Sequence, residues 1–259
     1  MTRHETFATT DISQKEMVLA TDLDGTFLGG SDEDREAFYA FIESNRDRVG
    51  LIFVTGRDPG FIVKKVKHGL PAPEYVIGDV GTTIARFDKL GHVSPIEELE
   101  APIAEGWGVA GPSVVTALSR AKGLTLQSSG FRYRASFDMD PDTFERGALD
   151  IVADLGLDAL ISDNQFFDVL PKGVSKGPSL LRLLAHLGVE NNRTLVAGDT
   201  LNDLSMLELG LPAVAVGGSE PELLTRLNGQ SHVHCAQGVG VAGIAEAILQ
   251  FELLSKSSS

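Results

Sequence analysis

The chain has 259 residues, 42% of them hydrophobic, and 36 acidic against 22 basic side chains give it a formal net charge of −14. This length can bury one large core or a core with an insertion, whereas the negative charge repels nucleic-acid backbones and anionic membrane surfaces. Cys235 is the single cysteine, so no internal disulfide can form. No stretch reaches the roughly 18 apolar residues that span a bilayer, and the polar start lacks a secretory signal. We therefore expect a cytoplasmic protein without nucleic-acid or membrane partners.

Short apolar runs rich in β-branched residues alternate with segments of helical period along most of the chain. The polar residues 1–16 are expected to form a flexible N-terminal extension. Ser31 is expected to cap a helix over 32–45, and Gly188 to end a helix over 177–188. Strands are predicted at 17–22, 50–56, 74–81, 194–199 and 212–218. This alternation is typical of an α/β fold in which helices cover both faces of a parallel sheet.

The middle of the chain, from about residue 85 to 170, has a different pattern. Residues 131–140 and 156–170 alternate like strands, and residues 112–123 and 142–156 have helical spacing. We therefore predict a smaller α/β domain over 85–170, inserted into a core domain formed by 17–84 and 171–259.

Two acidic residues, Asp22 and Asp24, follow the first predicted strand and precede Gly25. Open parallel sheets bind ligands at the carboxyl ends of their strands, so this position suits a functional site. Residues two apart on a strand face the same side, and two carboxylates in one pocket repel each other unless a cation lies between them. On this motif alone, a turn in which Asp and Gly supply only turn chemistry stays an open alternative.

A second predicted strand ends at Asp199, and Asn202 and Asp203 follow in the first turn of the next helix. Asp199 and Asp203 are four residues apart, a spacing that can direct both carboxylates to one point. Hard oxygen ligands without a nearby Cys or His pair favour Mg²⁺ over zinc. Capping of the helix by Asp199 is the alternative interpretation.

Two further segments offer groups that can bind phosphate. In FVTGR (53–57), Thr55 supplies a hydroxyl and Gly56 a backbone amide, and in GVSKG (173–177), Lys176 supplies a cation. An aspartate pair, a Thr, a Lys and an acidic pair in this order resemble the four motifs of the haloacid dehalogenase-like phosphohydrolases. The resemblance implies the Rossmann-like core of that superfamily with an inserted cap domain.

The resemblance also implies a role for each motif residue. Asp22 is the nucleophile that attacks phosphorus, and Asp24 protonates the leaving oxygen and later activates water. Mg²⁺ is held by Asp22, by the backbone carbonyl of Asp24 and by Asp199, with Asp203 at the water shell of the metal. The residues that bind the phosphoryl oxygens are Thr55, Gly56, Lys176 and Asn202.

The inserted domain resembles the type IIB (C2B) cap of the superfamily, the part that selects substrates. The segments LPKGVSKG (170–177), SEPELL (219–224) and HCAQGVGVAGIAEAILQFELL (234–254) resemble the sucrose-phosphate phosphatase branch. This branch implies hydrolysis of a glycosyl phosphate through an aspartyl phosphate, with sucrose 6-phosphate, mannosylfructose phosphate or glucosylglycerol phosphate as substrate types, and functional pairing with a glycosyl-phosphate synthase. In the cap, Tyr133 and Arg134 are candidate sugar contacts, with an ordinary exposed sheet face as the alternative.

Two other functions stay open at this stage. A sugar phosphomutase of the phosphomannomutase type shares the nucleophile, the acid and a related cap. A receiver-like phospho-aspartate switch shares the acidic pocket, the hydroxyl and the lysine, but it needs neither Asp24 nor a cap. Two other motifs are weaker: GVGVAG (238–243) lacks the second strand of a dinucleotide fold, and HVHC (232–235) lacks a second pair of metal ligands.

Overall fold

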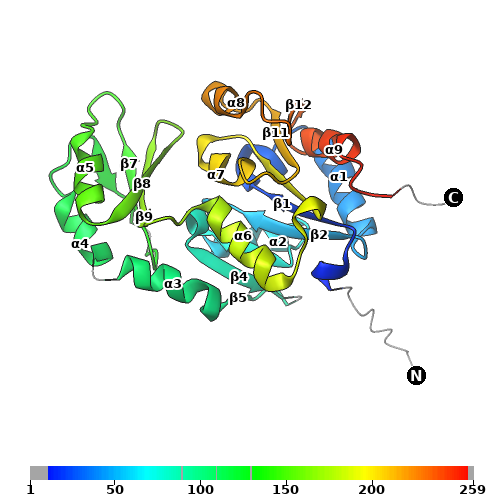
Figure 1. Cartoon of the computed structure of the whole chain (residues 1–259), viewed down its shortest axis with the longest axis horizontal. Coiled ribbons are helices and arrows are strands. Elements are labelled where there is room, and N and C mark those ends of the chain that lie inside the picture. Colours follow the sequence, from blue (N-terminus) through cyan, green and yellow to red (C-terminus); the bar gives the residue numbers. More distant parts are fainter. Residues whose placement is uncertain (1–10, 89, 109, 129, 256–259) are drawn as a thin grey trace.

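Two β-sheets organise the part of the chain that the structure, a computed structural model, describes, namely residues 11–88, 90–108, 110–128 and 130–255 (Figure 1). The larger sheet has eight strands in the order β12-β11-β10-β1-β2-β3-β4-β5. The strands from β12 to β3 run parallel, and β4 and β5 are antiparallel to their neighbours. These strands are β1 (Met17–Thr21), β2 (Val49–Val54), β3 (Tyr75–Gly78), β4 (Thr83–Phe87), β5 (Val93–Pro95), β10 (Thr194–Gly198), β11 (Ala213–Gly217) and β12 (Val233–Val239).

Helices cover both faces of this sheet, as the alternation of the sequence predicted. Every residue of β1 and of β2 is buried, because helices pack on both sides of these strands and exclude water from them. One face packs against α1 (Asp32–Ser44), α2 (Pro59–Lys67) and α9 (Val241–Gln250). The other face packs against α3 (Glu97–Trp107), α6 (Lys176–Leu187), α7 (Leu204–Leu207) and α8 (Pro221–Leu227). The expected α/β class is confirmed.

Two helix ends are set by the residues that the sequence singled out. The Ser31 hydroxyl accepts a hydrogen bond from the Asp34 amide at 3.1 Å, and the Asp34 side chain faces the backbone of Ser31 in return, which is a capping box at the start of α1. Gly188 ends α6 with a φ of 66°, a left-handed conformation that glycine adopts without steric cost.

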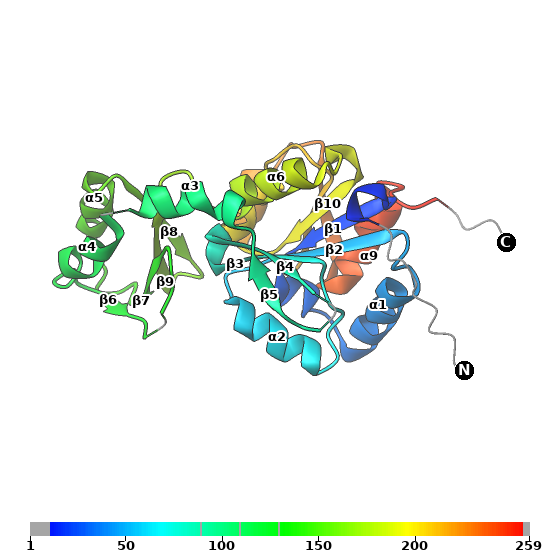
Figure 2. The ribbon, with the colours of Figure 1, turned by 90° about the horizontal axis from the view of Figure 1, so that it is seen from below.

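The smaller sheet has four antiparallel strands in the order β6-β7-β9-β8. Figure 2 shows it beside the large sheet, with α3 leading from one to the other. One face of this sheet packs its apolar residues against α4 and α5. The elements are α4 (Ala110–Ala117), β6 (Leu124–Leu126), β7 (Ala135–Met139), α5 (Gly147–Asp154), β8 (Leu157–Ser162) and β9 (Phe166–Pro171). We call this group of elements the cap.

Short helical turns connect several of these elements. Between β1 and α1 the chain makes a wide turn, Leu23–Phe27, with the amides of Phe27 and Leu28 bonded five residues back at 3.2 and 2.8 Å. The other short turns are η1 (Ile12–Gln14), η3 (Asp79–Gly81), η4 (Asn191–Arg193) and η5 (Leu201–Asp203). Within the described ranges, no helix is long and apolar enough to cross a membrane.

The structure differs from the expectation for the start of the chain. Residues 1–10 lie outside the described ranges. Residues 11–16, expected to belong to a flexible extension, contain a short helical turn and two buried side chains, Ile12 and Lys15. Ile12 is buried over Gly50, where a Cβ on the glycine would lie 2.6 Å from Ile12 Cγ1. Lys15 is also buried, donates to the Val49 carbonyl at 3.2 Å and pairs with Glu74. An apolar residue and the stem of a lysine therefore anchor this segment.

The strands of the small sheet cover fewer residues than the predicted insertion. Strand β5, at residues 93–95, lies within the stretch expected to be inserted, yet it pairs with β4 in the large sheet. The four strands of the small sheet lie between residues 124 and 171. The division of the chain into two domains at about residues 85 and 170 stays a prediction.

Candidate active site

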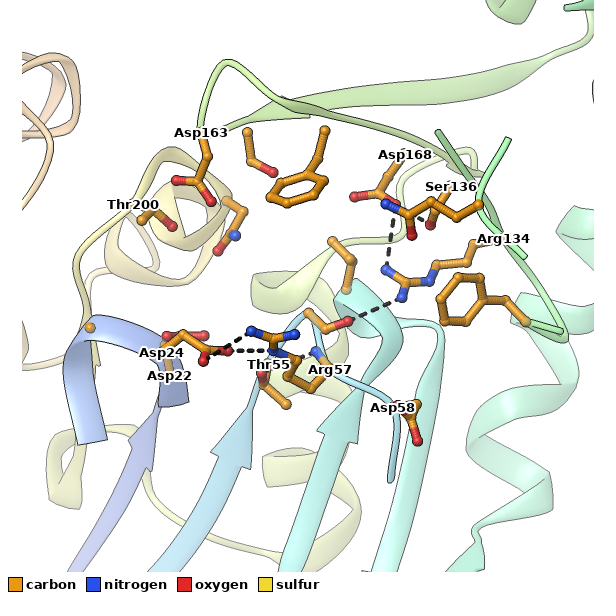
Figure 3. Close-up of a pocket in the computed structure, with 18 of the residues that line it drawn as sticks. Asp22, Asp24, Thr55, Arg57, Asp58, Arg134, Ser136, Asp163, Asp168 and Thr200 are labelled. Atoms are coloured by element: carbon orange, nitrogen blue, oxygen red, sulfur yellow. Dashed lines mark hydrogen bonds and ion pairs between the residues drawn. The ribbon is translucent and has the colours of Figure 1, made fainter. Parts of the chain in front are cut away.

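The polar residues singled out from the sequence gather at one edge of the large sheet. Asp22 follows β1, Thr55 follows β2 and Asp199 follows β10, and these three strands are neighbours in the sheet. Because the strands are parallel, their carboxyl ends meet at the same edge. Lys176 begins α6 and reaches the same place. Figure 3 shows this edge facing residues from the cap.

Lys176 is the centre of a buried cluster. Its side chain is 0% exposed, and Nζ donates to Asp22 Oδ1 at 2.7 Å, to Asp203 Oδ1 at 2.6 Å and to Asn202 Oδ1 at 2.5 Å. These three acceptors use all three donors of the ammonium group. The lysine therefore joins β1 to the turn η5 through charge-assisted hydrogen bonds.

Asp203 has a second task in this cluster. Its Oδ2 accepts the backbone amides of Asp199 at 2.9 Å and Thr200 at 3.0 Å. The carboxylate thereby fixes the loop that follows β10 and with it the position of the Asp199 side chain. Asp203 is fully buried, so these two hydrogen bonds are shielded from water.

Three carboxylates of the site could hold a metal ion. Asp22, Asp199 and Asp203 each offer an oxygen, and these oxygens lie within 4.8 Å of one another. Carboxylate oxygens are hard ligands that suit Mg²⁺. The side chain of Asp24 is outside this group, and its predicted contribution through the backbone carbonyl stays a prediction.

Burial and like charges shift the titration of this cluster. Burial raises the pKa of Asp22 well above its usual range, although Lys176 opposes the shift. Burial, with help from Asp203, raises the pKa of Asp199 to about 7. Burial alone would lower the pKa of Lys176, but Asp203 and Asp22 outweigh it, so this pKa is raised and the lysine stays charged. Such a cluster gains from a cation that neutralises its carboxylates.

Asp24 lines the same cavity as Asp22 but has a different partner. Arg57 Nε donates to Asp24 Oδ2 at 2.7 Å, and Nη2 donates to Oδ1 at 3.2 Å, so the guanidinium holds both oxygens. Both side chains are about half exposed. The strand ends at Thr21, so the two aspartates share the cavity through the wide turn and not through the continued strand that the sequence argument assumed.

Two residues of that turn fix Asp199. Thr26 Oγ1 donates to Asp199 Oδ1 at 2.7 Å. Gly25 has a φ of +80°, and a Cβ at this position would lie 2.1 Å from Asp199 Oδ2. The turn after β1 therefore requires glycine both for its conformation and for the close approach of the carboxylate.

The predicted phosphate-binding residues of the second motif lie beside the cluster. Thr55 is 1% exposed, its amide donates to the Ile77 carbonyl at 2.8 Å, and its Oγ1 accepts the Arg57 amide at 3.1 Å. Thr55 and Gly56 both line the cavity. The hydroxyl hydrogen of Thr55 remains available to a ligand, because the bond to Arg57 uses only its oxygen.

A cavity of about 480 Å³ lies between the edge of the large sheet and the cap. Successive residues of a strand point to opposite faces. Ala135, Phe137 and Met139 of β7 pack into the cap interior, whereas Ser136 points to the cavity. The cap residues that line the cavity are Gln127, Phe131, Arg134, Ser136, Ser162, Asp163, Phe166 and Asp168.

The structure separates the two candidate sugar contacts. Arg134 lines the cavity, but Tyr133 is not among its lining residues. The Tyr133 ring packs against the large core cluster and lies under the guanidinium of Arg132, whose carbon is 5.0 Å from the ring centre. Residues 132 and 133 form a bend that turns the Tyr133 and Arg134 side chains in different directions. The cavity lining gives no support to a sugar contact of Tyr133, and that role stays a prediction.

Sequence reasoning missed several residues of the cavity, among them Arg57, Ser136 and Asp168. The polar positions of ASFDM (135–139) alternate with apolar ones, and this alternation indicates that Ser136 faces away from the apolar interior of the cap. In FFDVLP (166–171), Asp168 is the one polar residue, and an isolated aspartate in an apolar strand is the signal that could have found it. For Arg57 the sequence holds no comparable signal, because a side chain that follows a strand and a glycine can turn in several directions.

Solved structures share this fold and define the class of the protein. A sucrose-phosphatase from Synechocystis sp. PCC6803, solved with sucrose and phosphate, is 25% identical to this chain with a TM-score of 0.83. The alignment covers 93% of this chain and 100% of that one. A haloacid dehalogenase subclass IIB sugar phosphatase is 16% identical with a TM-score of 0.61, covers 92% of this chain and 100% of its own, and shows the fold alone. The chain has the fold of the haloacid dehalogenase-like superfamily. Since the family model for sucrose-6F-phosphate phosphohydrolase matches residues 15–252, the chain belongs to that family.

Two curated relatives give further comparisons. A glucosylglycerol-phosphate synthase of Pseudomonas anguilliseptica is 39% identical over 93% of this chain, and the chain spans 31% of the length of that relative. A mannosylfructose-phosphate phosphatase of Agrobacterium fabrum is 29% identical over 91% of this chain and 97% of its own length.

Proposed function

We propose that this chain removes phosphate from a glycosylated sugar or polyol, with Mg²⁺ and through a phospho-aspartate on Asp22. One observation carries the proposal: the buried cluster of Lys176, Asp22 and Asp203 lies at one end of a cavity whose other wall is the polar face of the cap. Phosphoryl transfer needs such a combination of positioned charges and a cavity that excludes water.

Asp22 is the nucleophile in this proposal. Lys176 binds Oδ1, so we assign Oδ2 to the attack on phosphorus. The attack forms a bond between this oxygen and phosphorus and breaks the bond from phosphorus to the sugar oxygen, which takes a proton from Asp24. Asp24 then removes a proton from a water molecule that attacks the phospho-aspartate, releasing phosphate and restoring Asp22. Arg57 positions Asp24 at the edge of the cavity.

The oxygens of Asp22, Asp199 and Asp203 fit a hard divalent cation, and we propose that this cation is Mg²⁺. When bound, it neutralises negative charge on the nucleophile and the phosphate. The Thr55 hydroxyl lines the cavity and is proposed to bind a phosphoryl oxygen. Lys176 would bind one only by exchanging one of its three present acceptors for it. Asn202 and the amide of Gly56 complete the proposed phosphate site.

The cap wall and the relatives support a glycosylated substrate. Hydroxyl, amide and carboxylate groups of the cap face the cavity, and such groups bind sugar hydroxyls. The cavity volume is within the range of about 300 to 1,000 Å³ that small-molecule sites have. Among glucosylglycerol, mannosylfructose and sucrose phosphates, we propose glucosylglycerol phosphate first, because the relative with 39% identity is named for that compound.

We also propose that the chain acts beside a synthase that makes its substrate. The supporting observation is that this chain spans 31% of a relative named as a synthase, so a region similar to this chain occurs there within one longer polypeptide. A glycosyl transfer onto a phosphorylated acceptor is the reaction class that would supply such a substrate.

The test is phosphate release with Mg²⁺ from a panel of these three esters and simple hexose phosphates. We expect the highest kcat/KM for a glycosylated ester and a loss of about four orders of magnitude in Asp22→Asn. Asp150→Asn, a change at an exposed position of α5, is the matched control and should retain activity.

Mass spectrometry of acid-quenched enzyme should detect a phosphorylated wild type and an unmodified Asp22→Asn variant. If a phospho-enzyme forms but no ester is hydrolysed, the phospho-aspartate switch replaces this proposal. If the phosphate moves to another hydroxyl of the sugar, the mutase replaces it.

A further inference from the structure

A buried ion pair lies in the cap wall of the cavity. Arg134 and Asp168 both line the cavity, with side chains only 6% and 8% exposed. Arg134 Nη1 lies 3.4 Å from Asp168 Oδ1, and Ser136 donates a short hydrogen bond to the same oxygen. Figure 3 shows this group above the catalytic residues.

Arg134 also connects the cap to the large sheet. Its Nη2 donates to the Gly56 carbonyl at 3.1 Å and lies 3.7 Å from Asp79 Oδ1. Gly56 is adjacent to Thr55, so the guanidinium lies close to the proposed phosphate site. Its Nε is buried and has no hydrogen-bond partner within the described part of the chain. A buried donor without a partner is costly, and a ligand oxygen would satisfy it.

Both cations in the lining of the cavity are already paired. Arg57 is held by Asp24, and Arg134 lies between Asp168 and Asp79. The lining also includes Asp58 and Asp163. Beyond the catalytic cluster, the described lining therefore offers hydrogen-bond partners and negative charge but no unpaired cation.

We propose that Asp168 is a specificity-determining residue that restricts the substrate to a phosphate ester whose remaining part is uncharged. The proposal rests on the proposed function and adds the charge class of the substrate. Asp168 neutralises Arg134, so the arginine can offer a ligand the unpaired Nε donor but gives no net attraction to an anion. A carboxylate on the substrate would lie among like charges and leave water without gaining a cation.

The test compares two esters that differ by one charge. Glucitol 6-phosphate and 6-phosphogluconate have the same carbon chain, but the second carries a carboxylate in place of a hydroxymethyl group. Wild type should favour glucitol 6-phosphate in kcat/KM. In Asp168→Asn, the amide preserves the shape of the side chain while Arg134 loses a countercharge, and the preference should shift toward 6-phosphogluconate by about tenfold.

Two further variants distinguish an effect of the Arg134–Asp168 ion pair from an effect of the total charge of the cavity lining. Asp163→Asn removes the same charge from the cavity lining at a residue outside the Arg134 ion pair, and it should shift the preference by less than about threefold. In Asp168→Asn combined with Arg134→Gln, the gain for 6-phosphogluconate should disappear. Persistence of the gain in the double variant, or an equal gain in Asp163→Asn, would overturn the role of Asp168.

Binding of the same two esters can also be compared in a variant that is expected not to hydrolyse them. In the Asp22→Asn background, calorimetry gives Kd for both esters, and Asp168→Asn should shift their ratio in the same direction. If wild type hydrolyses neither ester but the binding ratio shifts, the proposed function fails and the inference about Asp168 stands. If wild type hydrolyses glucitol 6-phosphate and neither ratio responds to Asp168→Asn, the inference fails and the function stands.

Discussion

Lys176→Met is expected to lower the stability of the protein by leaving buried carboxylates without a cation. The lysine side chain is 0% exposed and lies 2.7 Å from Asp22 and 2.6 Å from Asp203, which are themselves 8% and 0% exposed. Breaking a buried ion pair by removal of one partner costs about 3–5 kcal/mol. Methionine nearly matches the volume of the lysine stem, so the loss of charge and not a cavity dominates the effect.

The loss should depend on pH with a definite sign. Burial already raises the pKa of Asp22 above its unfolded value, and removal of the lysine raises it further. Between the unfolded and the folded pKa the native state binds more protons than the unfolded state, so stability falls as the pH rises. The free-energy difference between Lys176→Met and wild type should therefore be larger at about pH 8 than at about pH 5.5.

Urea unfolding followed by far-ultraviolet circular dichroism, with EDTA present to remove divalent cations, measures this difference. Lys122→Met is the matched control, because Lys122 pairs with Glu145 at 2.6 Å but both side chains are more than half exposed. An exposed pair of this kind is screened by water and contributes little to stability. A loss below about 1 kcal/mol for Lys176→Met at both pH values would refute the reasoning.

Three further predictions concern the metal and the first helix. Because burial raises the pKa of Asp199 to about 7, protons compete with Mg²⁺, and its Kd from calorimetry should fall as the pH rises from about 6 to 8; a constant Kd would contradict this. Gly25→Ala, with its Cβ 2.1 Å from Asp199 Oδ2, should weaken Mg²⁺ binding at least about tenfold, whereas Gly130→Ala, in open space, should leave Kd unchanged. Ser31→Ala should cost about 1 kcal/mol in urea unfolding, and a loss no larger than that of Ser44→Ala at the other end of α1 would argue against the cap.

The large sheet could be predicted because its central strands are buried on both faces. MVLAT (17–21) and LIFV (51–54) are apolar at every position except the last residue of the first, a pattern that few other environments produce. Strand β12 was not predicted, because it lies at the edge of the sheet and mixes polar and apolar residues. Edge strands are half exposed, so their sequences carry a weaker pattern.

The gathering of the candidate site residues could be predicted for a similar reason. Asp22, Thr55 and Asp199 each end a strand, and the parallel topology brings strand ends together even when the strands are far apart in sequence. Most cap residues that line the cavity could not be predicted, because their identity depends on side-chain directions in the cap. The turn of Tyr133 away from the cavity follows from backbone directions between residues 131 and 134, where no regular strand fixes the alternation.

The position of β1 in the sheet has a consequence for the order in which the protein assembles. One edge of β1 pairs with β2, and the other pairs with β10, whose Ala197 is in register with Thr21. During synthesis, all four cap strands therefore emerge from the ribosome before β10 does. Until then, one edge of β1 has no strand to pair with. Non-local pairings of this kind form slowly. Protease protection of stalled nascent chains should appear at the cap first, and Asp22 should become protected only after residue 198 has emerged. The proposed nucleophile is therefore the first of the predicted site residues to be made and among the last to be fixed.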